Sequence, residues 1–172
     1  MSLVAAKIPP GWPEHEKRSP RAIRLATNTG PEQPLQVFDS PQIAAWLQSF
    51  RSDINDLTNL KPGWDGTGSH QVNVRHIWKL LRILIRLGAI AAPKPQLVPL
   101  PSGGVQAEWH HLDQTIEVGV TSDGEIFAFA TNENGEDVVE LEDNWFIPSD
   151  KLVTLRHSLS SLADARRHDP NA

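Results

Sequence analysis

The stretch that decides the fold is residues 105–131, VQAEWHHLDQTIEVGVTSDGEIFAFAT. Apolar and polar residues alternate along it, and such alternation is typical of half-buried β-strands. If His110 pairs with Thr115, one face of the resulting hairpin becomes apolar. On that face three pairs lie opposite one another: Val105 with Val120, Ala107 with Val118, and Trp109 with Ile116.

The next turn in this stretch is Asp123-Gly124, a dipeptide typical of two-residue hairpin loops. A two-residue loop here sets Val120 opposite Phe127 and Val118 opposite Phe129. Both hairpins then share one apolar face, since a shift of one residue would turn every side chain of a strand to the other side. We therefore expect an antiparallel sheet that buries both phenylalanines.

One further strand extends this sheet in the sequence pattern, and a possible short strand follows the sheet in the chain. One run with strand character covers 96–100, and a possible short strand covers 138–141. The turn between 96–100 and the central stretch is Pro101-Ser102-Gly103-Gly104. The sequence therefore predicts an antiparallel meander of about four strands.

Helices are predicted before and after the meander along the chain. Ser40-Pro41 is a helix start, and apolar spacing predicts a first helix over about 40–59. Asn73 caps a second helix that closes near Gly88, with Val74 on its inner side, and a last helix covers about 150–163. The predicted fold class is α+β, with two N-terminal helices, the meander and a C-terminal helix.

A chain of 172 residues without an internal repeat predicts one domain. Residues 1–38 are rich in proline and charge, which predicts an irregular arm. The α+β domain is predicted to cover 39–165, and 166–172 are predicted to form a frayed tail. The sequence has no cysteine and no run of roughly 18 apolar residues, and Met1 to Pro13 contain no apolar core of the length that a signal peptide needs. We therefore expect a cytoplasmic protein with no membrane partner and no disulfides.

The charges are distributed unevenly, and the net charge is −5. Between Lys94 and Lys151 lie twelve acidic residues and no lysine or arginine, whereas the rest of the chain is basic. We therefore expect one acidic and one basic side. The acidic side would engage a cationic protein, or the basic side of a second copy. The carboxylates expected to do so are Glu108, Glu117, Asp123 and Glu125.

The basic side would lie on the second helix, where Arg75, Lys79, Arg82 and Arg86 recur at i, i+4, i+7 and i+11. Such a stripe suits contacts with an acidic protein surface or with nucleic acid. The negative net charge favours a solvated helix face over nucleic-acid binding.

In the predicted register Glu108 lies opposite Glu117, with His110 one pleat along. Two facing carboxylates can raise the pKa of one of them, or can hold a metal together with the histidine, which would suit metal-assisted hydrolysis. The favoured interpretation is an exposed acidic strand face, because charged residues are mostly just solvated. We expect no cofactor and no metal.

The glycine-rich segment 61–70, KPGWDGTGSH, offers Trp64, Asp65 and His70 as ligand-binding or acid–base candidates. It lacks the spacing of a phosphate-binding loop. The favoured interpretation is structural, with Trp64 buried between two helices and Asp65 accepting hydrogen bonds from the loop's own amides.

The loop Gly63-Trp64-Asp65-Gly66-Thr67-Gly68, followed by an amphipathic helix and then by Gly103-Gly104-Val105, resembles a group of small, largely uncharacterised bacterial proteins. Members of that group often occur near toxin–antitoxin or phage-defence genes. The resemblance covers about 57–131 and brings no catalytic residues with it. It implies an antitoxin-like or immunity-like binding role.

These observations favour a non-enzymatic protein-binding module, antitoxin-like or associated with defence, whose acidic side engages a cationic partner. One alternative is a metal-assisted hydrolytic enzyme that uses Glu108, Glu117 and His110. The other is a nucleic-acid binder that uses the basic helix at 73–88.

Overall fold

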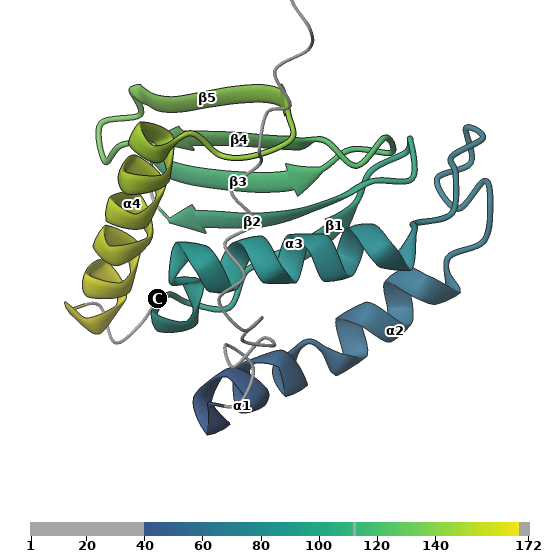
Figure 1. Cartoon of the computed structure of the whole chain (residues 1–172), viewed down its shortest axis with the longest axis horizontal. Coiled ribbons are helices and arrows are strands. Elements are labelled where there is room, and N and C mark those ends of the chain that lie inside the picture. Colours follow the sequence, from purple (N-terminus) through teal and green to yellow (C-terminus); the bar gives the residue numbers. More distant parts are fainter. Residues whose placement is uncertain (1–39, 112, 169–172) are drawn as a thin grey trace, which may run out of the picture. The chain divides into compact units, whose positions relative to one another are not determined.

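The structure is a computed structural model that describes residues 40–111 and 113–168. The predicted arm at 1–38 and residues 169–172 lie outside the described residues. Helices α1 (Pro41–Ser49), α2 (Arg51–Asn59) and α3 (Val74–Leu87) precede the 3₁₀ helix η2 (Ala89–Ala91). Strands β1 (Gln96–Pro99), β2 (Val105–His111), β3 (Gln114–Val120), β4 (Ile126–Thr131) and β5 (Asp137–Asn144) follow, and then α4 (Ser149–His168) (Figure 1).

The α+β fold class is confirmed, although the sheet has five strands rather than four. They form one antiparallel meander in the order β1-β2-β3-β4-β5. The predicted register of β2 and β3 is confirmed, with Val105 opposite Val120 and Trp109 opposite Ile116. All four of these side chains are buried. This face of the sheet, which we call the inner face, therefore carries the core.

The predicted register of the β3–β4 hairpin is wrong by one residue. Val120 lies opposite Ile126, and Gly119 lies opposite Phe127. Phe127 and Phe129 are therefore not on the inner face, and both are half-buried on the opposite, outer face. The smaller Ile126, Ala128 and Ala130 are buried in their place.

The cause is the length of the hairpin loop. Thr121 pairs with Glu125, with 2.9 Å between the Thr121 amide and the Glu125 carbonyl, so three residues rather than two form the loop. Gly124 takes a φ of +85°, the left-handed conformation that glycine adopts in three-residue loops. The dipeptide Asp123-Gly124 suits both loop lengths, and the extra residue reverses the faces of β4.

The predicted first helix is instead two helices that meet at Phe50, which is fully buried. Lys94, which precedes β1, donates to the Ser49 carbonyl at 2.9 Å and pairs with Asp53 at 2.5 Å. Its ammonium also lies 4.9 Å from the centre of the Phe50 ring. A lysine 45 residues further along the chain thus caps α1, and local spacing cannot reveal that contact.

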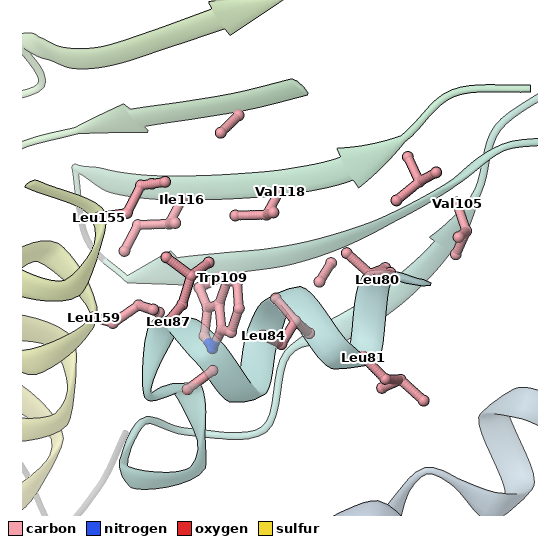
Figure 2. Packing of buried hydrophobic residues seen from close by; sticks show 14 of the residues in the cluster. Leu80, Leu81, Leu84, Leu87, Val105, Trp109, Ile116, Val118, Leu155 and Leu159 are labelled. Atoms are coloured by element: carbon pink, nitrogen blue, oxygen red, sulfur yellow. The ribbon is translucent and has the colours of Figure 1, made fainter. Parts of the chain in front are cut away.

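Helix α3 has the predicted ends. The Asn73 side chain accepts a hydrogen bond from the Arg75 amide, and Gly88 closes the helix at a φ of +80°. Val74 is 45% exposed rather than on the inner side. Figure 2 shows α3 directing its apolar side toward the sheet, and each fully buried leucine contributes about 1.5–3 kcal/mol. The buried residues of α3 are Ile77, Leu80, Leu81, Leu84, Ile85 and Leu87.

Helix α4 is longer than predicted and continues to His168, so the first part of the expected tail is helical. Its buried Leu155 and Leu159 lie near Ile116 of β3 and Leu87 of α3 (Figure 2). Strand β5 is likewise longer than the predicted 138–141. Across the described residues, no helix is long and apolar enough to cross a membrane.

One close contact on the outer face yields a stability test. A Cβ atom at Gly119 would lie 2.0 Å from the Phe127 ring, so Gly119→Ala must displace the ring. We expect the substitution to lower the free energy of unfolding by about 1–3 kcal/mol. In a Phe127→Ala background it should be nearly neutral, because the ring is gone. Urea unfolding of the four proteins gives the coupling, and an equal cost in both backgrounds would contradict this packing.

Candidate functional site

Four side chains form a row across the outer face, which we call the outer row. Glu108 of β2 lies opposite Glu117 of β3, as predicted. Glu117 lies opposite Phe129 of β4, and Phe129 lies opposite Glu140 of β5. Helices α3 and α4 pack on the other face, because their buried side chains share one core cluster with the inner-face residues.

The three carboxylates of the outer row differ in their surroundings. Glu108 accepts a hydrogen bond from the Gln106 side-chain amide, and its other oxygen lies 3.2 Å from Nε2 of His110. Glu117 and Glu140 have no hydrogen-bond or ion-pair partner among the described side chains. Phe129 is therefore flanked on both neighbouring strands by carboxylates with free acceptor capacity.

A hollow of about 370 Å³ opens beside the outer row, between β4 and β5. Phe127 and Phe129 line it together with Glu140 and Glu142. The pairing of β4 with β5 shifts register here, between Ile126 and Ala128. Aromatic rings combined with carboxylates are well suited to a cationic side chain.

The predicted catalytic set is only partly brought together. Glu108 and His110 line a hollow of about 340 Å³ at the sheet edge, together with Lys94, but Glu117 does not line it. Within 40–111 and 113–168, no three His, Asp or Glu side chains are placed to hold a metal ion. The arrangement offers a glutamate–histidine pair without the third member of the predicted set.

The loop at 61–70 uses Asp65 internally, as the structural interpretation expects. One carboxylate oxygen accepts hydrogen bonds from the amides of Thr67 and Ser69, at 2.8 and 3.2 Å, and the other accepts from the Thr67 hydroxyl at 2.6 Å. The hydrogen bonds from Thr67, and more weakly those from Ser69, hold the pKa of the Asp65 carboxyl well below its usual range. Asp65 therefore acts as an ionised carboxylate that stabilises the conformation of its own loop.

Trp64 is half-buried and lies outside the core cluster, so the expectation that it is buried is wrong. Its indole nitrogen donates to the His70 carbonyl at 3.2 Å, and the His70 side chain is exposed. The His70 amide donates to Pro101, and the Asn73 amide donates to Gly103. The glycine-rich loop thus packs against the turn before β2, and its polar groups form hydrogen bonds that stabilise the loop and this contact.

The four predicted cations converge on a groove of about 580 Å³, which we call the basic groove. Arg75, Lys79, Arg82 and Arg86 of α3 line one side. The segment 145–147 and the start of α4 line the other side. The acidic outer row and the basic groove thus lie on different elements. The apolar side chains of the groove are Ile83, Ile126, Ile147 and Leu152.

The groove also contains aromatic residues that the sequence analysis does not single out. Trp78, Trp145 and Phe146 line it and are 49%, 68% and 67% exposed. The ammonium of Lys79 lies 5.6 Å from the centre of the Trp145 ring. The position of Trp78 between Arg75 and Lys79 in the sequence could have identified it as part of this site. Trp145 and Phe146 could not be identified in this way, because they meet α3 only in the folded chain. Phe127 and Phe129 were missed because of the hairpin register.

The remaining predicted acidic residues lie apart from the outer row. Asp123 belongs to the β3–β4 loop, and Glu125 ends that loop. The Gly124 carbonyl of the same loop accepts a hydrogen bond from Lys79. These two carboxylates therefore lie beside the basic helix, at the end of the sheet.

Comparison with protein-family models, with curated proteins and with solved structures returned no match for this chain. The fold and the two surfaces define an α+β protein with an antiparallel five-stranded meander, an acidic aromatic sheet face and a basic aromatic groove.

The role of Asp65 can be tested by pH. Because its folded pKa is lowered, its stabilising contribution is full above the unfolded pKa of about 3.9 and declines as the pH falls toward the folded value. We expect Asp65→Asn to melt at a lower temperature than the parent at pH 7, with the difference narrowing below about pH 4. Asp56→Asn, on the exposed side of α2, is the control. A difference that does not change with pH would contradict this role.

Proposed function

We propose that this chain is a non-enzymatic protein-binding module whose outer sheet face engages a cationic protein partner. The observation that carries the proposal is the outer row, in which Phe129 lies between the free carboxylates Glu117 and Glu140. Aromatic residues are enriched at protein interfaces, where a few residues carry most of the binding energy.

The chemistry of the row suits an arginine or lysine of the partner. A guanidinium over the Phe129 ring gains a cation–π contact of about 0.5–2 kcal/mol and lies within reach of carboxylates on both neighbouring strands. Glu117 also repels Glu108 across the strands, and a bound cation relieves that repulsion. The hollow beside Phe127 and Phe129 leaves space for the stem of such a side chain.

Residues 57–131 resemble small bacterial proteins that often occur near toxin–antitoxin or phage-defence genes. That resemblance favours a role for this chain in binding a basic toxin or another defence component. The absence of cysteine supports a location in the cytoplasm. The alternative of a metal-assisted hydrolytic enzyme has less support, because Glu117 does not line the hollow that contains Glu108 and His110.

A charge reversal tests the proposal. A short synthetic peptide with arginine at alternate positions serves as the cationic probe, and stopped-flow fluorescence gives its association rate as a function of ionic strength. We expect the parent rate to fall as salt rises, because the Debye length shrinks to about 8 Å at physiological salt. Glu117→Lys should slow association, whereas the melting temperature should hold or rise, since the lysine attracts Glu108.

The matched control is Asp56→Lys, which changes the net charge equally from an exposed position on α2. It should leave most of the association rate intact. If both reversals slow association equally, only net charge matters and the outer row is not the site. Phe129→Leu separates the contribution of the aromatic ring from that of the carboxylates. It should speed dissociation of the peptide and have little effect on its association rate.

A further inference from the structure

The basic groove carries a second, independent inference, because its cations lack acidic partners. Among the described side chains, no carboxylate forms an ion pair with Arg75, Lys79, Arg82 or Arg86. The three arginines are exposed, and Lys79 is half-buried beside Trp145. Four like charges on one helix side repel one another by a few tenths of a kcal/mol per pair, and an anionic ligand would relieve this.

The arrangement of the cations selects an elongated ligand. Arg75 and Arg86 are eleven residues apart on α3, a rise of about 16 Å along the helix axis. The intervening steps of three or four residues place a positive charge about every 5–6 Å. A single phosphate or carboxylate could contact only one or two of these groups, so the row matches a chain of regularly spaced anions.

The aromatic residues of the groove indicate which kind of polyanionic ligand it binds. Trp78 lies on α3 among the cations, and Trp145 and Phe146 lie on the facing segment. All three rings are about half or more exposed, which is unfavourable in water. The Lys79 ammonium lies over the Trp145 ring, and the exposed remainder of the three rings is accessible for stacking. Bases stack on such rings at sites that also hold the phosphates with basic side chains.

We propose that the basic groove binds single-stranded nucleic acid, with phosphates along Arg75, Lys79, Arg82 and Arg86 and bases against Trp78, Trp145 and Phe146. A single strand fits because its bases are unpaired and free to stack. A duplex does not fit, because its bases are already stacked and the cations line a concave groove of about 580 Å³. This site is separate from the outer row, and either one can be absent without affecting the other.

Two other occupants offer negative charge but match less of the groove. An acidic peptide would satisfy the cations and leave no role for three open aromatic rings. The acidic outer row of a second copy would bring three carboxylates, but they cross neighbouring strands instead of following one line along a helix. Both occupants are included in the test as outcomes that overturn the proposal.

The test measures binding of the full chain to fluorescent single strands of about ten nucleotides, within the range of known site sizes. Oligothymidylate and oligouridylate serve as separate probes for DNA and RNA, and fluorescence anisotropy gives the affinity over a salt series. For four phosphate contacts, log K should fall with log salt at a slope of about −3. Arg82→Gln should make that slope shallower by about 0.7.

Aromatic variants separate stacking from charge. Trp145→Ala and Trp78→Ala should each weaken binding about 5- to 100-fold and leave the salt slope unchanged. Trp145 is 68% exposed, so its removal should not affect folding, and thermal melting checks this. Matched controls are Arg51→Gln, exposed on α2, and Trp64→Ala, in the glycine-rich loop. Both controls, and Glu117→Lys, should bind as tightly as the parent or more tightly.

Three results would overturn the proposal. The first is the absence of a specific site, seen either as binding of neither probe at low salt or as equal losses for Arg51→Gln and Arg82→Gln. The second is competition by oligoglutamate of the same length as effective as competition by the unlabelled strand, which would assign the groove to acidic peptides. The third is a dimer of the protein alone, seen by sedimentation, that Arg82→Gln dissociates.

Discussion

The packing of α3 on the inner face of the sheet is the constraint on which the rest of the structure depends. Its buried leucines fill the space over Ala107 and Val118, and α4 closes the same core with Leu155 and Leu159. Since a helix with one side in the core is polar on the other, the lysine and arginines of α3 must face outward. Since alternate residues of a strand point to opposite faces, the glutamates of β2 and β3 must face away from the helix. A single interface thus places the basic stripe of α3 and the outer row on opposite sides of the sheet, while Asp123 and Glu125 lie in the β3–β4 loop beside α3.

The predictable parts of the fold are those whose decisive contacts are local in the chain. The β2–β3 register was predictable because only one pairing buries Val105, Trp109 and their partners on one face. The ends of α3 were predictable because Asn73 and Gly88 act on their own helix. The break between α1 and α2 at Phe50 was not predictable, since the lysine that caps α1 comes from a segment 45 residues away. The β3–β4 register failed because the same dipeptide suits loops of two and three residues.

The candidate sites follow the same rule. The sequence predicted the basic stripe of α3 and the facing pair Glu108 and Glu117, because each lies within one helix or one hairpin. The aromatic parts were missed, because Phe129 reaches the outer face only through the longer loop. Trp145 and Phe146 reach the stripe only when the chain after β5 returns past α3. The charge pattern alone predicted an acidic and a basic surface. The folded chain adds aromatic side chains to each of these surfaces.

The central claim is that one helix–sheet interface creates two separate binding surfaces of opposite charge. The most direct measurement follows backbone amide shifts of two isotope-labelled samples, one titrated with the arginine-rich peptide and the other with oligothymidylate, because the two ligands would bind each other in one sample. The account predicts two separate sets of shifts, the first on β3, β4 and β5 around Phe129 and the second on α3 and 145–147. One shared set of shifted amides would contradict it.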